Sequence, residues 1–500
     1  MSTFDYVLQG FAAALTVQNL LFALLGVVLG TLVGVLPGIG PAMTVALLLP
    51  VTYAVPPAAA LILFAGVLYG GMYGGSTTSI LLNTPGESAS VITALEGNKM
   101  ARAGRGAQAL ATAAIGSFVA GTIGTVLLAL LAPQVAGWAV RLTSADYFAL
   151  AVLAFCSVTT VLGASPLRGV AALALGLALG IVGLDPMSSQ ERFTMGIGEL
   201  VNGVDIVLAA VGLFAVGEAL HTAAALRRGH PEVVPVGTVW WLPKEDLKRS
   251  WKPWLRGSLL GFPLGAVPAG GPVISTFLSY ALERKLARKP EEFGNGAIEG
   301  VAGPEAANNA GAAGMLVPLL TLGLPTSATA AVMLSAFGSY SIEPGPLLFQ
   351  SQPLLVWTLI ASLYIGNVLL LVLNLPLVGV WARLLRVPRP YLYAGILVCA
   401  SLGAYAGSQQ YAGLLVLLAL GVLGFLMRRY GWPVLPTVLG LVLGPVAEEN
   451  LRKALQVSQG DASVLVGTTF AQVVLGLAAL CLVVPAGLRL VRALRRVPVS

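Results

Sequence analysis

Long apolar runs, separated by short polar or basic segments, fill almost the whole chain. A helix needs roughly 20 apolar residues to cross a bilayer, and by that measure the pattern predicts about 10–12 transmembrane helices. Clear candidates lie at residues 107–131, 147–162, 169–182, 204–220, 354–373, 391–406, 413–427, 433–443 and 464–484. The pattern therefore predicts an all-α integral membrane protein.

A Gly/Pro motif interrupts the apolar pattern once in each half of the chain. Residues 34–41 read GVLPGIGP, and residues 265–272 read GAVPAGGP. Each is followed downstream by a second break rich in small hydroxyl residues, NTPGESAS and then GLPTSATA. Gly and Pro end helices and free backbone groups, which in lipid must line a cavity or be buried in protein. Paired breaks in two halves predict broken or re-entrant helices at a transport site.

The charges of the loops indicate how the two halves are related. The loop after the first break is uncharged at residues 51–57, whereas its counterpart, ERKLARKPEE, is strongly basic. After the second break the order is reversed, because EGNKMARAGRG is basic and GSYSIEPGPLLFQSQP has no Lys or Arg. Basic loops face the cytoplasm, so matching loops should face opposite sides. We therefore expect two inverted repeats with scaffold helices, at residues 1–226 and 257–500.

The longest hydrophilic stretch, residues 227–256, separates these halves. It combines basic residues with Trp240, Trp241, Trp251 and Trp254. Such a composition is typical of a cytoplasmic linker that lies at the membrane interface.

Composition excludes several other classes of protein. The chain is 57% hydrophobic and 10% charged, whereas a soluble domain carries about 25% charged residues. The net charge of +7 comes from basic residues clustered in short loops, which does not indicate nucleic-acid binding. The N-terminus lacks the basic region of a cleaved signal peptide. A phosphate-binding GxxxxGK[ST] loop and a metal-binding cysteine pattern are also missing, so we expect no enzyme and no bound cofactor.

The breaks contain the residue types that bind anions. A helix start presents free N–H groups and a partial positive charge, which attract an anion without any basic side chain. We expect the substrate to be bound by small polar residues at the four breaks: Thr44, Asn83, Thr84, Gly86, Ser88, Ser275, Thr326, Ser327 and Thr329. The alternatives are simple proline kinks, and hydroxyl groups that bond to their own helix carbonyls.

A third motif, GPEAANNAGAAG, places polar groups in an almost uncharged region. A carboxyl group and two amides there are costly unless they are paired, and such groups mark ion or proton routes. We expect the coupling ion, Na+ or H+, near Gly38, Gly40, Gly270, Gly271, Glu305, Asn308 and Asn309. The alternative for Glu305 is a helix-capping or interfacial role.

At these motifs the chain resembles the large membrane subunit of the tripartite tricarboxylate transporters, the TctA family. The similarity is strongest in GVLPGIGPAMTVALLLP, YGGSTTSILLNTPGESAS, EGNKMARAGRGAQAL and the long run from KPEEFGNG to LPTSATAAVM. The resemblance implies a multi-pass permease of the bacterial inner membrane. It also implies a periplasmic solute-binding protein and a small membrane subunit as partners, with citrate or another carboxylate imported together with Na+ or H+.

Two departures from the family pattern lie at candidate site positions, at Pro268-Ala269-Gly270 and at Pro325-Thr326-Ser327. The substrate can therefore differ from citrate. Our hypothesis is cation-coupled carboxylate symport by an elevator-like movement. The sequence leaves the oligomeric state undecided, and a homodimer is one of the alternatives. An anion channel and an intramembrane hydrolase are the alternatives from other classes.

Overall fold

The computed structural model describes residues 3–36, 40–84, 86–161, 165–185, 187–224, 234, 242–267, 271–384, 389–408 and 410–494. These residues are almost entirely helical, and one two-stranded hairpin joins β1 (Gly183–Leu184) to β2 (Glu191–Arg192). Seven of the described helices are long and apolar enough to cross a membrane. Six shorter apolar helices of 10–17 residues accompany them. The all-α membrane class predicted from the sequence is confirmed.

The first half contains two helices that stop and restart at the predicted breaks. After α1 (Thr3–Ala14), α2 (Val17–Val35) ends before the first break and α3 (Pro41–Thr52) begins with a proline in its first turn. Next, α4 (Pro57–Leu82) ends at Asn83, which has a left-handed backbone with φ 55°. The chain resumes through η1 (Ser88–Ser90), α5 (Val91–Met100), the π-helix η2 (Ala101–Arg105) and α6 (Gly106–Ala139).

The second half repeats this order. Here α11 (Lys244–Gly265) and α12 (Gly271–Leu286) flank one break, and α13 (Glu299–Leu322) and α14 (Ala328–Ser339) flank the other. The helix α13 ends at Gly323 with φ 66°, which matches the left-handed end of α4. The short helices η5 (Pro290–Glu292) and α15 (Leu348–Ser351) connect these elements, and α16 (Pro353–Asn374) takes the place of α6.

The expected linker at residues 227–256 is helical over its last part. Residues from Lys244 onward form the first half of α11, and Trp254 is buried within it. Of the remaining linker, the structure describes only Val234, Leu242 and Pro243.

Each half contains one helix pair in which glycines bring two backbones into contact. Gly26, Gly30 and Gly34 of α2 face α4, and a Cβ at Gly30 would lie 2.5 Å from the Val67 carbonyl oxygen. In the second half, glycines at the same spacing, 257, 261 and 265, place α11 against α13. Small residues four apart permit this close approach in a membrane, where packing has to stabilise helix association.

Two sets of hydrogen bonds connect the two halves of the chain. The Tyr340 hydroxyl, after α14, donates to the Thr52 carbonyl at the end of α3 at 2.7 Å. At the other end, the Glu96 carboxylate on α5 accepts hydrogen bonds from Gly296 N at 2.7 Å and from Ala297 N at 3.0 Å, in the turn before α13. The loop after α3 thus meets the loop after α14, and the end of α5 meets the loop after α12.

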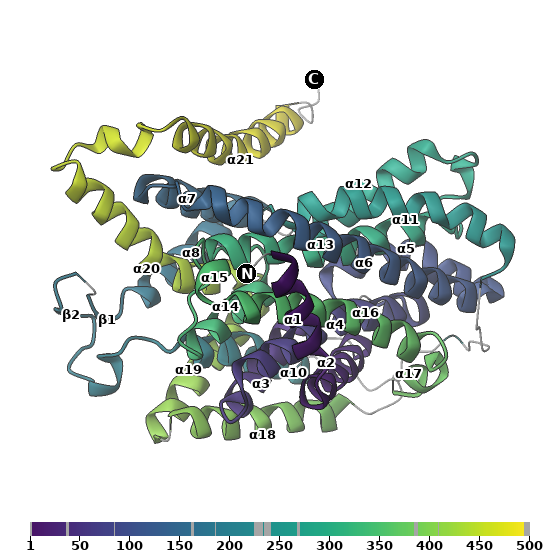
Figure 1. Ribbon diagram of the computed structural model, residues 1–500, viewed down its shortest axis with the longest axis horizontal. Coiled ribbons are helices and arrows are strands. Elements are labelled where there is room, and N and C mark those ends of the chain that lie inside the picture. The colour runs from purple at the N-terminus through teal and green to yellow at the C-terminus, as the bar shows by residue number, and fades with distance from the viewer. Residues whose placement is uncertain are drawn as a thin grey trace, which may run out of the picture.

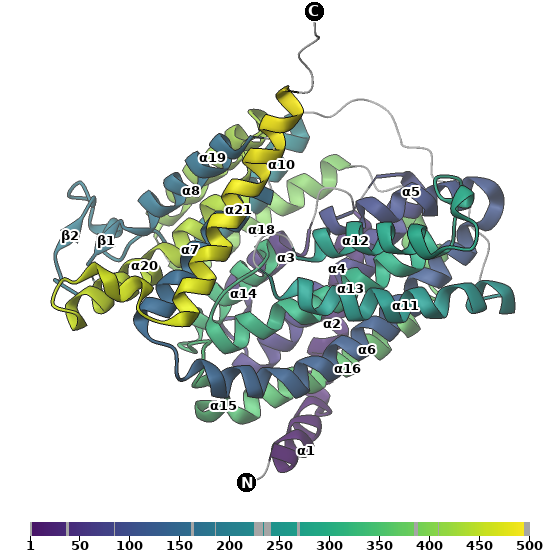
Figure 2. The ribbon, with the colours of Figure 1, turned by 90° about the horizontal axis from the view of Figure 1, so that it is seen from above.

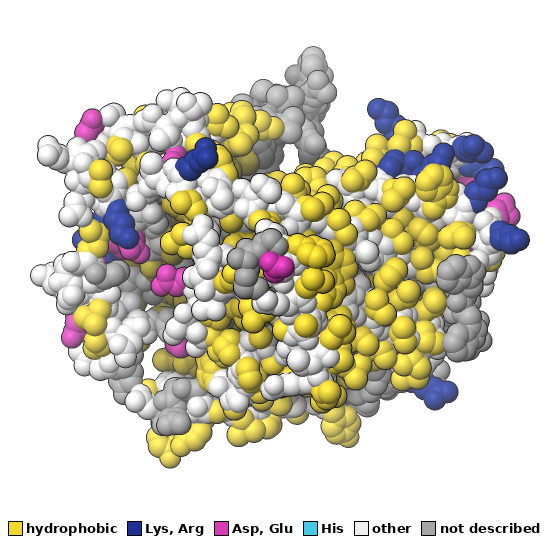
Figure 3. All heavy atoms as spheres, in the orientation of Figure 1, with side chains coloured by type: hydrophobic (Ala, Val, Ile, Leu, Met, Phe, Trp, Pro, Cys, Tyr) yellow, Lys and Arg dark blue, Asp and Glu magenta, His cyan; other side chains and the backbone are white. Residues whose placement is uncertain are grey.

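The basic loops gather at one end of the molecule, which we call the basic end. Figure 1 shows α5, α11 and α12 together there, opposite the β1–β2 hairpin. Arg105 and Asp246 form an ion pair at 2.7 Å within this end. Figure 3 shows Lys and Arg side chains concentrated over these helices, with mainly hydrophobic side chains across the middle. A surface of this kind fits a bilayer around the middle and water at both ends.

The remaining helices form a scaffold group beside the breaks. It comprises α7 (Ser144–Val161), α8 (Pro166–Gly180), η3 (Gly198–Leu200), α9 (Ile206–Ala210), the π-helix η4 (Val211–Val216), α10 (Gly217–Ala224), α18 (Arg389–Ser408), α19 (Tyr411–Arg429), α20 (Val434–Val457), η6 (Ala462–Val466) and α21 (Thr469–Leu494). The short helix α17 (Val378–Leu384) packs instead against α2 and α4. Figure 2 shows α11, α13, α6 and α16 side by side, with most of the scaffold helices on the other side of the molecule.

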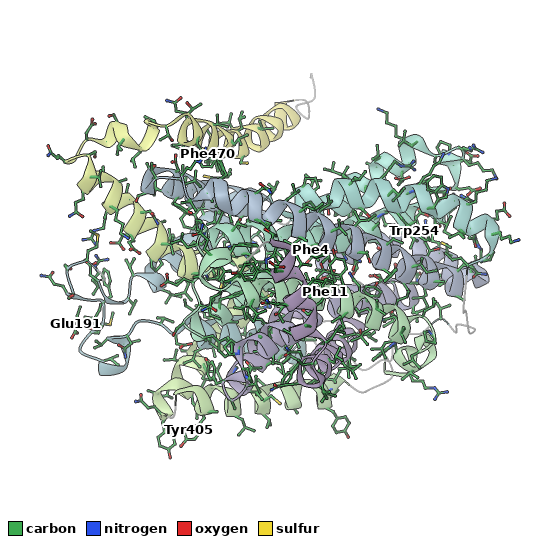
Figure 4. The ribbon with its side chains drawn as sticks, viewed as in Figure 1. Phe4, Phe11, Glu191, Trp254, Tyr405 and Phe470 are labelled. Carbon is green, nitrogen blue, oxygen red and sulfur yellow. The ribbon has the colours of Figure 1, made fainter. Side chains whose placement is uncertain are left out.

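The last helix is anchored by aromatic packing. Phe470 on α21 contacts Trp138 near the end of α6 edge to face, with ring centroids 5.0 Å apart, and Figure 4 shows Phe470 on the side of α21 that faces α7. The scaffold group is therefore joined to the helices of the first break region through the long helix α6.

Candidate functional site

All four breaks contribute to one cavity of about 540 Å³. The cavity is lined by residues from the starts of α3, η1, α5, α12 and α14, from α4 and α13, and from the scaffold group: Gly40, Pro41, Ala42, Met43, Met72, Gly86, Glu87, Ser88, Ala89, Val91, Phe214, Glu218, Pro272, Val273, Met315, Ser327, Ala328, Thr329, Arg428 and Leu435. Segments that are far apart in the sequence therefore meet around one cavity.

Helix N-termini surround this cavity. Gly40 is the N-cap of α3, and Gly271 is the first residue of α12. The Ser327 hydroxyl caps α14 by accepting a hydrogen bond from Ala330 N at 3.1 Å. The first turns of these helices have N–H groups without helical partners, and their partial positive charges add up where helix starts converge. The cavity is thus suited to an anion.

The cavity wall that the scaffold group provides is charged. Arg428 on α19 and Glu218 on α10 form an ion pair, with Nε and Oε2 2.5 Å apart. The same guanidinium donates from Nη1 to the Leu213 carbonyl at 2.7 Å and to the Gly424 carbonyl at 3.1 Å. Phe214, from the π-helix η4, completes this wall.

A buried polar network lies behind the cavity, along α13. Asn308 donates from Nδ2 to Glu87 Oε1 at 2.9 Å, which connects α13 to the cavity lining. Asn309 donates to the Ser117 hydroxyl on α6 at 2.7 Å. One turn earlier, the Glu305 carboxylate accepts hydrogen bonds from the hydroxyl groups of Ser76 and Thr93. All three α13 side chains are fully buried.

The predicted substrate residues divide into two groups. Gly86, Ser88, Ser327 and Thr329 line the cavity. The hydroxyl groups of the other four Ser and Thr residues donate hydrogen bonds to backbone carbonyls. Thr44 bonds to the Gly40 carbonyl, Ser275 to the Pro272 and Ala307 carbonyls, Thr326 to the Gly265 carbonyl and Thr84 to the Leu82 carbonyl. Asn83 ends α4 and is exposed. The back-bonded alternative thus describes Thr44 well, as the general behaviour of Ser and Thr in helices suggests.

The predicted coupling-ion residues are also divided. Gly40 lines the cavity, and Gly271 starts α12 beside the cavity-lining Pro272. Glu305, Asn308 and Asn309 form the buried network described above. Gly38 and Gly270 lie outside the described residues.

Sequence analysis missed Glu218 and Arg428 as cavity residues. Arg428 stands next to Arg429 at the end of an apolar run, which is the pattern of an ordinary cytoplasmic helix end. The two residues are 210 positions apart, and their contact depends on the packing of α10 against α19. A possible signal was the glycine spacing on both helices, since Gly217 and Gly424 are in backbone contact.

Comparison with known proteins shows the family of this chain. The model of the tripartite tricarboxylate transporter TctA family matches residues 20–439. An uncharacterized 52.8 kDa protein of the TAR-I ttuC' 3' region in Agrobacterium vitis is 47% identical over 477 residues, which cover 95% of this chain and 94% of that protein.

A second protein, of the TAR-II ttuC' 3' region in the same organism, is 45% identical over 223 residues, which cover 45% of this chain and 92% of that protein. No solved structure matches the chain. The family match spans all four breaks and the cavity-lining scaffold residues. The chain therefore belongs to the TctA family, as a membrane component of a tripartite tricarboxylate transporter.

Proposed function

We propose that this protein imports a carboxylate across the bacterial inner membrane together with Na+ or H+, as the permease of a tripartite transporter. A periplasmic solute-binding protein delivers the substrate, and a small membrane subunit completes the assembly. The observation that supports this most strongly is the convergence of helix starts from both halves on one cavity. Half-helix N-termini that point at an anionic group are typical of secondary transporters.

The charges of the cavity support a coupled mechanism. Among the described residues, Glu87 and Glu218 contribute two carboxylates to its lining, against the single guanidinium of Arg428. A carboxylate substrate adds further negative charge at a depth where little water screens it. A cation or proton that enters with the substrate lowers this electrostatic cost.

The network on α13 offers a place for that cation. The side-chain oxygens Oδ1 of Asn308 and Asn309 are buried and accept no hydrogen bond from any residue that the structure describes. Hard cations prefer oxygen ligands of this kind. Glu305, in the same helix, is a carboxylate that can take up the proton if the coupling ion is H+.

The test is uptake of radiolabelled citrate into proteoliposomes that contain the complete transporter, with a Na+ gradient, a proton gradient or neither. We expect uptake to depend on one of the two gradients. Glu305→Gln keeps the shape of the side chain, and we expect it to lower uptake at least tenfold if the coupling ion is H+. Uptake at the same rate with and without either gradient would contradict the symport proposal.

The same vesicles distinguish the alternatives. A channel gives flux that does not saturate with substrate concentration, whereas a carrier saturates. A hydrolase alters the substrate chemically, so recovery of unchanged citrate from the vesicle lumen would exclude that reaction for this probe.

A further inference from the structure

Arg428 is the single cation among the described residues that line the cavity. Its side chain is largely buried, with 16% exposure, and that of Glu218 is 27% exposed. A positive charge in such a place is costly unless its partners are fixed. The local structure shows how the guanidinium is held and which part of it stays available.

The π-helix η4 is built to receive this guanidinium. In a π-helix the backbone bonds run from i to i+5, and single turns of this kind are frequent at functional sites. Here the Leu213 carbonyl, inside η4, accepts a hydrogen bond from Arg428 Nη1 at 2.7 Å. Gly217 follows directly, and a Cβ at that position would lie 3.1 Å from Arg428 Nη1 and 2.9 Å from the Gly424 backbone. Nη1 is therefore fixed by the backbone on both sides.

The opposite edge of the guanidinium is only half occupied. Nε donates to Glu218, whereas Nη2 has no hydrogen-bond partner among the described residues. Nε and Nη2 form one of the two forks with which arginine binds a carboxylate through two parallel hydrogen bonds. Glu218 uses one arm of this fork, so a carboxylate that uses both arms would be bound better.

We propose that Arg428 is a ligand for one carboxylate of the substrate, and that Glu218 is the group that this carboxylate displaces. This rests on the proposed function and narrows its substrate class. The helix starts at Gly40 and Ser327 take one carboxylate, and Arg428 takes another from the scaffold wall. The cavity therefore selects anions that carry at least two carboxylates. In the empty site Glu218 neutralises the guanidinium.

The competing interpretation is a purely structural ion pair between α10 and α19. The two interpretations differ in a double variant. If the pair only stabilises helix packing, Glu218→Gln combined with Arg428→Gln removes both charges and should restore much of the function that either change alone removes. If Arg428 binds substrate, the double variant stays as impaired as Arg428→Gln.

Two measurements on the complete transporter in proteoliposomes test the proposal. The first is the KM for uptake of citrate. The second uses Val91→Cys, an exposed position in the cavity lining, in a chain whose three native cysteines are replaced by alanine. The rate at which a thiol reagent modifies Cys at this position is measured with and without citrate, succinate or acetate.

We expect Arg428→Gln to raise the KM for citrate at least tenfold and to abolish protection by citrate and succinate. Acetate has one carboxylate, so we expect it to protect weakly and equally in the parent protein and in Arg428→Gln. Arg428→Lys should restore part of the affinity, because it keeps the charge but loses the fork. Glu218→Gln should lower the KM, because the competing carboxylate is gone. The double variant should behave like Arg428→Gln.

Recovery of citrate affinity in the double variant, or full protection by citrate in Arg428→Gln, would overturn the proposal. The proposal would also be overturned if none of the three carboxylates protected the cysteine at position 91 in the protein that keeps Arg428. Protection by citrate without any uptake would instead contradict the proposed transport, while the assignment of Arg428 would stand.

Discussion

At the scale of single residues, the cavity depends on positions that admit no side chain. Gly86 lies in the second break, and a Cβ there would be 2.3 Å from the Gly34 carbonyl oxygen and 2.6 Å from the Gly75 Cα. The second break thus packs directly against the end of α2. The equivalent position in the second half is Thr326, whose hydroxyl donates to the Gly265 carbonyl at 3.0 Å. Each half therefore covers a carbonyl group in the last turn of the helix before its first break, α2 or α11, in a different way.

We expect Gly86→Ala to destabilise the fold by about 1–3 kcal/mol or more, because the added methyl group meets backbone atoms that cannot rotate away. The measurement is the thermal unfolding of the purified protein in detergent. Gly40→Ala is the matched control, since Gly40 also lines the cavity but a Cβ there has no atom within 4 Å. Equal stability of the two variants would contradict the packing described here.

At the scale of helices, the close pairs α2–α4 and α11–α13 form the framework around the breaks. A Cβ at Gly261 would lie 2.3 Å from the Ala307 carbonyl oxygen, on the same turn of α13 as Asn308. Packing of α11 therefore fixes the position of the buried polar network.

We expect Gly261→Ala to lower both stability and uptake, because it pushes α13 away from α11. Gly366→Ala on α16 is the control, since its Cβ would meet only the side chain of Val27 at 3.8 Å. The amount of monodisperse protein recovered after gel filtration reports folding, and citrate uptake reports function. A Gly261→Ala protein with normal yield and uptake would show that the helix pair tolerates more separation than its geometry indicates.

The scaffold helix α20 is tied to the β1–β2 hairpin by a buried carboxylate. Asp185 accepts hydrogen bonds from the Ser188 hydroxyl at 2.6 Å and from Met187 N at 3.0 Å, and it pairs with Arg452 and Arg192. These partners, the Ser188 hydroxyl first, hold the pKa of Asp185 below its ordinary value. A carboxyl group with a lowered pKa in the folded state stabilises the protein above its ordinary pKa, and this contribution is lost as the pH falls further.

We expect Asp185→Asn to lower the melting temperature at pH 7, where the wild-type carboxylate is fully ionised. The difference between the two proteins should shrink as the pH falls below about 4, the ordinary pKa of an aspartate. Thermal scans of both proteins over this range measure the difference. A difference that is constant with pH would exclude ionisation of Asp185 as its cause.

At the scale of the whole molecule, the loop charges and the hydrogen bonds between the halves describe one orientation in the membrane. Segments 99–105, 244–252 and 284–292 lie together at the basic end, and the loops near Thr52 and Tyr340 meet elsewhere. The positive-inside rule predicts that the basic end faces the cytoplasm.

We expect a membrane-impermeant thiol reagent to label Ser341→Cys from outside intact cells, and not to label Arg102→Cys or Lys285→Cys. All three positions are exposed in the structure. Permeabilised cells provide the control, because all three variants should then be labelled. Labelling of Arg102→Cys and Lys285→Cys from different sides would contradict the inverted repeats.

Much of this architecture was predictable because it follows from local chemistry. The breaks end at proline, glycine and a left-handed Asn83, and the apolar runs become the helices α7, α16 and α19 with small differences at their ends. The helix α6 continues to Ala139, past the predicted end at residue 131. The contribution of the scaffold group to the cavity was not predictable. The position of Arg428 depends on a π-helix at Leu213 and on the contact between two glycine-containing helices, and neither follows from hydrophobic periodicity.

The carboxylate of Glu96 restricts how the two halves can move. It belongs to the first half, yet it accepts backbone hydrogen bonds from the second half at Gly294, Gly296 and Ala297, and another from the Tyr280 hydroxyl on α12. Four bonds to one buried carboxylate join α5 to the α12–α13 turn. Separating α5 from this turn would leave the buried carboxylate without its partners, so these bonds hold the two halves together at the basic end.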